Sequence, residues 1–229
     1  MILGIMQPYF LPYLGYWQMI NAVDKYVVYD DVNFIKGGWI NRNNFLIQGK
    51  AKLVSIQLDG ASSNKLINEI SIKDDFSNFM KMIQINYAKA PYFMYICEIL
   101  NKIISFDKSN LGMFLFNQIK VVCEYLNINT EILLSSDLNK NNDLKGKDKV
   151  IQICKLLGAD TYYNAIGGQE LYDKQEFAKN DISLYFLKTN ITLYKQLKNE
   201  FVGNLSILDV LMFNSPDECK KLLNNYELV

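Results

Sequence analysis

Histidine does not occur anywhere in the sequence, and its absence excludes more classes of function than any other feature of the chain. Histidine is the commonest general base and the commonest metal ligand in enzymes. A histidine-based catalytic triad and a histidine-containing zinc site are therefore both excluded. Any catalysis has to depend on other side chains, such as carboxylates, lysine, tyrosine or cysteine.

Cysteine is scarce, and no two of the cysteines form a Cys-x-x-Cys pair. Each stands in an apolar, helix-like context, which is typical of reduced cysteines in a protein core. One cysteine acting as a nucleophile is the less favoured alternative. We therefore expect a reducing, cytoplasmic environment. The four residues are Cys97, Cys123, Cys154 and Cys219.

A surplus of either charge is also missing, because 24 Lys and Arg residues balance 24 Asp and Glu residues. Domains that bind nucleic acids usually carry a basic surplus, so no nucleic-acid partner is expected. No apolar run reaches the roughly 18 residues that a membrane-spanning helix needs, and the first residues lack the basic segment of a signal peptide. We expect no membrane span.

The chain does have enough apolar residues, 50% of 229, to build a substantial core. Short apolar segments alternate with segments of helical periodicity, which predicts a parallel sheet with right-handed crossovers. We therefore expect an α/β fold with an open, mostly parallel, five-stranded sheet. The expected strands are residues 2–6, 26–29, 130–134, 161–165 and 182–187, and the helices between and after them are 12–24, 147–157, 167–179, 205–213 and 216–226.

Two segments interrupt this alternation. Residues 40–72 predict an inserted β piece, with a hairpin of strands 44–47 and 53–58 and a further strand at 67–72. Residues 75–126 contain three helical patterns and predict a helical subregion, in which Ser109 or Asn110 caps the last helix. No change of composition marks a boundary, so we expect a single domain over residues 1–229.

Polar residues follow four of the five expected strands. In an open parallel sheet, ligands bind beyond the carboxyl ends of the strands, so these residues are the first candidates for a binding site. Capping of turns and helices is the alternative role for the serines and glycines among them. The candidates are Gln7 and Tyr9 after the first strand, Asp30, Asp31 and Asn33 after the second, Ser135 and Ser136 after the third, and Asn164, Gly167 and Gly168 after the fourth.

Among the acidic residues, the adjacent pair Asp30 and Asp31 is the strongest candidate for a functional site. A carboxylate at a strand end could hold Mg²⁺, or could orient or deprotonate an attacking amine. Because successive residues of an extended chain point to opposite sides, one of the two is expected to face the site. A pair that caps a turn is the alternative. The cofactor stays unknown, with Mg²⁺ as an open choice.

The segment "IKGGWINRN", residues 35–43, provides a second cluster of candidates. Lys36 and Arg42 suit a phosphate or carboxylate group, and Asn41 would support them. Trp39 could stack on a ring, and Lys36 is also a candidate catalytic base. A solvated turn with one buried tryptophan is the alternative.

A further acidic residue, Asp209, lies within an apolar helical stretch. A buried carboxylate needs a partner, so we expect Asp209 to cap a helix or to pair with Arg42 or Tyr194. For this residue a structural role is favoured over a catalytic one.

Four segments, taken together, resemble the WbqC-like family: "MQPYFLPYLGYWQMI", "YDDVNFIKGGWINRN", "LGADTYYNAIGGQELYD" and "LSILDVLMFN". Genes of that family tend to lie in bacterial surface-polysaccharide clusters, including O-antigen clusters. The resemblance implies a transferase that makes or modifies a surface sugar, with a sugar or sugar nucleotide as its small-molecule partner. Acyl or aminoacyl transfer to an amino sugar, such as glycyl transfer, is the reaction we expect. Tyr9, Tyr13 and Tyr16 would then form an aromatic wall for the sugar or base.

The opening segment is also similar to the start of nucleotidylyltransferases and pantothenate synthetases, in which a His-x-Gly-His signature binds nucleotide phosphate. Leu14-Gly15-Tyr16 stands at the comparable place, and both histidines are missing. A nucleotidyl- or adenylate-forming enzyme without the usual histidines is therefore an alternative. A non-catalytic binding protein of the same pathway is another, and the oligomeric state is left open.

Overall fold

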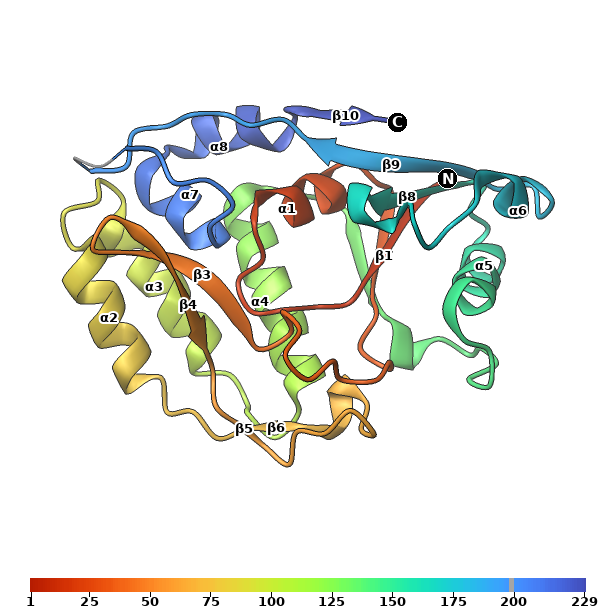
Figure 1. Ribbon diagram of the computed structural model, residues 1–229, viewed down its shortest axis with the longest axis horizontal. Helices are drawn as coiled ribbons and strands as arrows, with labels where there is room; N and C mark the ends of the chain where they lie inside the picture. The colour runs from red at the N-terminus through yellow and green to blue at the C-terminus, as the bar shows by residue number, and fades with distance from the viewer. Residues whose placement is uncertain (198–199) are drawn as a thin grey trace.

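The computed structural model describes residues 1–197 and 200–229, and within them a six-stranded sheet crosses the molecule in the order β10-β9-β8-β1-β2-β7 (Figure 1). The five expected parallel strands are confirmed. A sixth strand, which the sequence did not predict, pairs antiparallel with β9. The strands are β1 (Ile2–Met6), β2 (Lys25–Val28), β7 (Glu131–Leu134), β8 (Thr161–Ala165), β9 (Ser183–Thr189) and β10 (Tyr226–Leu228).

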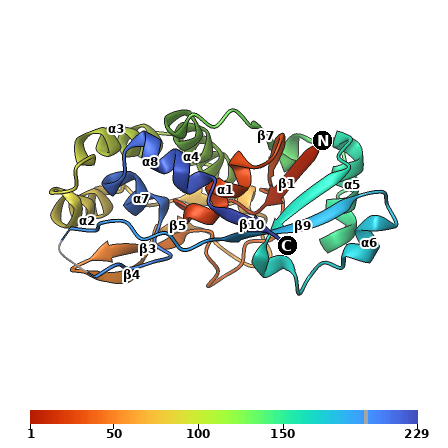
Figure 2. The ribbon, with the colours of Figure 1, turned by 90° about the horizontal axis from the view of Figure 1, so that it is seen from above.

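The order of the five parallel strands along the sheet is 3-2-1-4-5 when they are counted in chain order. The direction of winding thus reverses between β1 and β8, which makes this pair the switch point of a doubly wound sheet. Helices α1 (Leu14–Asn21), α4 (Leu111–Leu126) and α8 (Pro216–Leu223) pack on one face, and α5 (Gly146–Leu157) and α6 (Lys174–Ala178) pack on the other. Seen from above, α5 and α6 lie at the end of the molecule away from α2 and α3 (Figure 2).

Strand β2 shows how the sequence produces two core layers. Its buried residues alternate, since Tyr26 and Val28 join the core on the side of α1 and α4, whereas Val27 joins the core under α5. Side chains of an extended strand point alternately to the two faces of the sheet, so a continuous apolar run serves both layers.

The inserted β piece contains the hairpin of β3 (Arg42–Ile47) and β4 (Lys50–Ser55). Gln48 and Gly49 join the strands in a two-residue turn, with φ angles of 51° and 74°. Positive φ at both positions is what a tight hairpin turn requires, so the connection is shorter than the one expected from the sequence. The strand expected at 67–72 is wrong for its first half, where η1 (Ile67–Glu69) is a 3₁₀ turn.

Strand β6 (Ser71–Ile72) is all that remains of that expected strand, and it pairs with β5 (Leu58–Asp59). The helical subregion is confirmed as α2 (Ser77–Tyr87), α3 (Phe93–Ile104) and α4. The Asn110 side chain accepts a hydrogen bond from the Met113 amide at 3.0 Å, which makes Asn110 the cap of α4.

Two expected helices differ from the structure near the end of the chain. Residues 167–179 form only the turn η3 (Ile166–Gly168), an irregular stretch and the short helix α6, because adjacent glycines favour a turn over a continuous helix. The last expected helix ends at Leu223, Asn224 and Asn225 follow outside any helix or strand, and Tyr226 begins β10. The helix α7 (Ile207–Phe213) precedes it, as expected.

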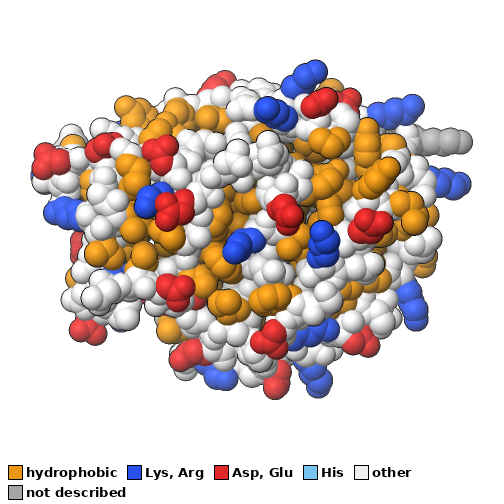
Figure 3. Space-filling model, turned by 180° about the vertical axis from the view of Figure 1, so that it is seen from behind, with side chains coloured by type: hydrophobic (Ala, Val, Ile, Leu, Met, Phe, Trp, Pro, Cys, Tyr) orange, Lys and Arg blue, Asp and Glu red, His pale blue; other side chains and the backbone are white. Residues whose placement is uncertain are grey.

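All four cysteines are free thiols, and burial raises the pKa of the Cys123 thiol to about 12. Such thiols stay protonated, which agrees with a role in the core and not as nucleophiles. No helix in residues 1–197 or 200–229 is long and apolar enough to cross a membrane. On the face seen in Figure 3, acidic and basic side chains are interspersed among hydrophobic ones.

Candidate functional site

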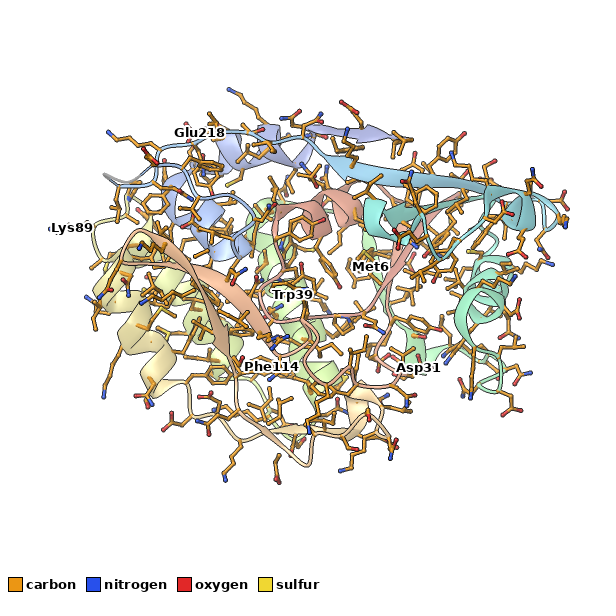
Figure 4. All side chains as sticks on the ribbon, in the orientation of Figure 1. Met6, Asp31, Trp39, Lys89, Phe114 and Glu218 are labelled. Carbon is orange, nitrogen blue, oxygen red and sulfur yellow. The ribbon has the colours of Figure 1, made fainter. Side chains whose placement is uncertain are left out.

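A cleft of about 630 Å³ opens at the carboxyl ends of β1 and β8, where the strand order reverses. Open α/β sheets bind ligands at this place. Figure 4 labels Met6, at the end of β1, and Trp39, on the segment 35–40 that contributes the other wall. The lining residues are Ile5, Met6, Gln7, Pro8, Tyr9, Tyr29, Ile35, Gly38, Trp39, Ile40, Asn164, Ala165, Gly167, Gly168, Leu171 and Tyr172.

Sequence reasoning placed six of these residues in the candidate site: Gln7, Tyr9, Trp39, Asn164, Gly167 and Gly168. The parallel pairing of β1 with β8 brings the ends of these two strands together, and a backbone contact adds the segment with Trp39. The Phe10 amide donates to the Ile40 carbonyl at 2.9 Å, which ties the segment 35–40 to the turn after β1. That turn cannot continue β1, because Pro8 follows the strand closely and lacks an amide hydrogen.

Large apolar side chains stand exposed at the cleft. Trp39 is 53% exposed, Ile35 is 52% exposed and Leu171 is 73% exposed. Exposed aromatic and aliphatic side chains at the edge of a concave site are typical of ligand contact surfaces. The alternative of a buried tryptophan is therefore wrong, and the exposed ring of Trp39 is open to stacking.

The turn after β8 is shaped by a close backbone approach. A Cβ atom at Gly168 would lie 2.7 Å from Asn164 Nδ2, so only glycine fits there without a shift. The side-chain oxygen Oδ1 of Asn164 in turn accepts a hydrogen bond from the Ala165 amide at 2.7 Å, which fixes that side chain. Gly167 is different, because a Cβ there would meet no atom within 4 Å.

No Asp, Glu, Lys or Arg is among the described residues that line the cleft. The titratable groups there are tyrosine hydroxyls. Burial raises the pKa of Tyr9 well above its ordinary value, and burial also raises the pKa of Tyr29 and of Tyr172. These hydroxyls therefore stay protonated at neutral pH and can donate hydrogen bonds to a ligand.

Asp30 is fully buried behind the strand ends and does not line the cleft. Its two carboxylate oxygens accept hydrogen bonds from the Ser136 amide at 3.0 Å, the Ser136 hydroxyl at 2.7 Å and the Asn68 side chain at 3.2 Å. The carboxylate thus ties the turn after β7, η2 (Ser135–Asp137), to η1 of the inserted piece. This arrangement corresponds to the alternative in which the acidic pair holds a turn.

Asp31, labelled in Figure 4, belongs to a buried ionic cluster with two lysines. Its Oδ2 atom lies 2.7 Å from Lys140 Nζ and 3.2 Å from Lys149 Nζ. Burial by itself raises the pKa of Asp31, but the hydrogen bond and charge of Lys140 and the charge of Lys149 outweigh it, so the pKa is lowered. Lys149 also lies 5.4 Å from the centroid of the Tyr29 ring, which lines the cleft.

The remaining candidates lie outside the cleft. Tyr16 is in the core, packed edge-on against Tyr9, Trp17 and Tyr26, and Ser135 is fully buried. Lys36 is exposed on the segment 35–40 without being among the lining residues. The others hold loops or line a second cavity: Asn33 donates to Ser63 O, Asn41 to Ile56 O and Arg42 to Gly37 O, and Tyr13 lines a cavity at the end of β9.

The buried Asp209 pairs with Tyr194, as expected, and not with Arg42. Its carboxylate accepts hydrogen bonds from Tyr194 at 2.7 Å, Gln196 at 2.6 Å and Tyr87 at 3.1 Å. Burial raises the pKa of this carboxyl group. Three neutral donors thus satisfy a carboxylate at the core, which is a structural role.

Sequence reasoning missed the two lysines of the ionic cluster and several lining residues of the cleft, among them Tyr29, Leu171 and Tyr172. One signal was available for Lys149, which lies among the buried residues Val150, Ile153 and Cys154 of α5. A lysine on the apolar side of a helix indicates a buried partner. No group of acidic or cysteine residues in the described part of the chain is arranged to hold a metal ion.

Comparison with known proteins assigns the chain to a family. The model of the WbqC-like protein family matches residues 7–221. An uncharacterized protein of Mycobacterium tuberculosis is 28% identical over 217 residues, a match that covers 92% of each chain. No solved structure matches the chain significantly.

Proposed function

The chain belongs to the WbqC-like protein family, and we propose that it is a transferase that binds a sugar or sugar nucleotide in the cleft between β1 and β8. The surface-polysaccharide setting implied by the family resemblance supports this class of substrate. The reaction would be acyl or aminoacyl transfer to an amino sugar.

The observation that carries the proposal is the chemistry of the cleft. It combines exposed aromatic and aliphatic side chains with amides and protonated hydroxyls, and its described lining has no charged side chain. A sugar ring is neutral, with apolar C–H faces and many hydroxyls, so it suits stacking on Trp39 and hydrogen bonding to Gln7 and Asn164. Lys36, exposed on the same segment as Trp39, is the candidate cation for a diphosphate that would extend beyond the cleft.

The transfer step needs an activated acyl donor, such as a thioester, and a neutral amine on the sugar. The amine nitrogen attacks the carbonyl carbon, a C–N bond forms, and the bond from that carbon to the thiolate breaks. The amine proton leaves to solvent or to the thiolate. Because no carboxylate or lysine is among the described lining residues, the protein would act chiefly by holding the two groups together and by donating tyrosine hydroxyls to the developing oxyanion.

The uncharged lining of the cleft also favours a second candidate, a non-catalytic binding protein of the same pathway. No carboxylate, lysine or histidine in the described lining is available as a general base. Nucleotidyl transfer is less well supported than either, because the described lining of the cleft has no charged side chain to hold a triphosphate and its metal inside it.

Two measurements on the purified protein separate these candidates. Saturation-transfer NMR with a panel of uridine diphosphate amino sugars tests binding, with Trp39→Ala as the variant that removes the stacking surface. Mass spectrometry after addition of acyl thioesters tests for a gain of one acyl group on the bound sugar. Binding without a mass gain would favour the binding protein, and no binding by any sugar would contradict the proposal.

A further inference from the structure

Strand β4 has a free edge in the part of the chain that the structure describes. Its other edge pairs with β3 over six residues, and Ile47 and Lys50 close the hairpin next to its two-residue turn. The pair that closes such a turn is hydrogen-bonded, and hydrogen-bonded pairs alternate along the strands with pairs whose backbone groups point outward. The amides and carbonyls of Ala51, Leu53 and Ser55 therefore point away from β3. Figure 2 shows the hairpin at the side of the molecule.

The hydrogen bonds around the hairpin agree with this alternation. On β3, the Leu46 amide points outward and donates to the Tyr87 hydroxyl of α2 at 2.8 Å. The three outward-facing residues of β4 have no such backbone partner among the residues described. Beyond them, the Gln57 amide donates to Asp74 Oδ2 at 3.0 Å, which ends the free edge. A further strand can therefore be added along the length of β4.

A groove of about 390 Å³ borders this edge, between the end of β4 and α2. Phe79 and Met82 of α2 provide its apolar part. Its charged side chains are Asp74, Asp75 and Lys73, so acidic groups outnumber basic ones among the described lining residues. A basic side chain with a long aliphatic stem suits such a groove, because the stem packs on the apolar part and the ammonium group meets carboxylates.

Large apolar side chains stand exposed along the free edge. Leu53, at its centre, is 49% exposed, and Ile85 of α2 is 79% exposed. Ile85 is three residues after Met82, so it extends the helix face that borders the groove. An exposed strand edge with apolar side chains favours pairing with another strand, but lysines on an edge strand protect it against most partners. The partner therefore has to accommodate Lys50 and Lys52.

We propose that this edge is a dimer interface, in which β4 pairs antiparallel with β4 of a second copy of the chain. A twofold axis at Leu53 places Leu53 of the two copies opposite each other, and Ala51 of each copy opposite Ser55 of the other. This register pairs all the outward-facing residues of both strands. The proposal is independent of the transferase function, because the groove shares no lining residue with the cleft between β1 and β8.

The register explains how the lysines are accommodated. Lys50 of one copy lies opposite Ile56 of the other, and opposite residues of an antiparallel pair point to the same face. Ile56 lines the groove, so the stem of Lys50 enters it and the ammonium group approaches its acidic end. Lys52 lies opposite Val54, so no two lysines face each other directly. The twofold axis repeats each of these contacts.

Sedimentation equilibrium of the full-length protein tests the interface. We expect the wild type to dimerise at high micromolar concentration. Leu53→Glu places two carboxylates opposite each other at the axis and should weaken dimerisation at least tenfold. Leu156→Glu, at a residue of α5 that is 47% exposed, is the matched control and should leave dimerisation unchanged. A monomeric wild type, or equal effects of the two substitutions, would overturn the proposal.

Reversal of charge tests the contact with the groove. Lys50→Glu brings a carboxylate to the acidic end of the groove and should weaken dimerisation several-fold. Lys52→Glu makes the same change of charge opposite Val54, two residues further from that end, and should have a smaller effect. Equal effects of the two reversals would show that Lys50 does not enter the groove and would contradict this register.

Disulfide cross-linking tests the register without disrupting the interface. The Cα atoms of two opposed residues at position 53 would lie roughly 5.5 Å apart, which a disulfide spans. Residues at position 55 would be offset by four residues, roughly 14 Å, which is too far. Oxidation with diamide should therefore link Leu53→Cys into covalent dimers and leave Ser55→Cys at the level of the wild type. Equal cross-linking of the two variants would overturn the proposed pairing.

Discussion

Lys149 Nζ lies 3.2 Å from the Oδ2 atom of Asp31, and both side chains are buried beyond the end of β2. Lys140 approaches the same oxygen at 2.7 Å, so one carboxylate holds two ammonium groups. Burying charges is unfavourable unless they are paired, and each member therefore depends on the others.

Replacing Asp31 by alanine should destabilise the protein strongly. The change leaves two buried lysines without their carboxylate, for which we expect a loss of about 3–5 kcal/mol in the free energy of unfolding. Urea denaturation followed by circular dichroism measures this loss. The control is Glu227→Ala, which breaks the exposed pair with Lys188 and should cost less than about 1 kcal/mol. Similar losses for both variants would contradict the importance of the cluster.

The lowered pKa of Asp31 predicts how the free energy of unfolding depends on pH. The folded-state pKa of Asp31 is lowered, so the ionised form stabilises the fold at neutral pH. This contribution is complete above the unfolded-state pKa of about 3.9 and is lost as the pH falls through the lower folded-state value. Urea midpoints of wild type and Asp31→Ala should differ by a constant amount above about pH 5 and converge below about pH 4.

Trp39→Ala should weaken sugar binding at least tenfold, which corresponds to about 1.4 kcal/mol, because it removes an exposed aromatic ring from the cleft. Titration with a uridine diphosphate amino sugar that binds the wild type provides the measurement. Tyr95→Ala is the matched control, since Tyr95 is an aromatic residue of α3 that is 66% exposed and does not line the cleft. An unchanged affinity in Trp39→Ala would show that Trp39 does not contact the sugar.

The two glycines after β8 should respond differently to alanine. Gly168→Ala forces a Cβ against Asn164, so we expect a loss of about 1–3 kcal/mol in stability together with weaker sugar binding. Gly167→Ala places its methyl group in open space and should change stability by less than about 0.5 kcal/mol. The melting temperatures of the two variants give the comparison, and the reverse order would show that the turn is built differently.

The pH dependence of transfer should follow the amine of the sugar and not a residue of the protein. The lining tyrosines have raised pKa values and stay protonated up to about pH 9, so no group of the described lining loses a proton in that range. The rate should rise as the amine becomes neutral and then level off. A bell-shaped profile in that range would indicate an acid or base that the cleft does not contain.

Part of this site can be predicted from the sequence, because the ends of apolar strands can be recognised in it. Gln7 and Tyr9 come shortly after β1, Asn164 is the penultimate residue of β8, and Gly167 and Gly168 come shortly after β8, so the rule for open parallel sheets places them on one edge. The same rule failed for the acidic pair at the end of β2. It fixes the position of the backbone but not whether a side chain faces the ligand or the interior.

The ionic cluster and β10 could not be predicted from the sequence in this way. Lys140 comes from an irregular segment rich in Asn, Lys and Asp, and nothing local distinguishes it from its exposed neighbours. Its burial depends on Asp31, more than a hundred residues earlier in the chain. Strand β10 is only three residues long, so its assignment comes from pairing with β9 and not from a periodic pattern.

The long segment between β2 and β7 has a consequence for how the protein folds. Val28 and Leu134 are register partners in adjacent strands, yet residues 29–133 separate them along the chain. Closing so large a loop costs entropy before the strands can pair, and parallel pairing of distant segments is slow. The edge formed by β7 should therefore join the sheet late, after the intervening hairpin and helices have condensed. Pulse-labelled hydrogen exchange should show the amides of β7 gaining protection after those of α2 and α3.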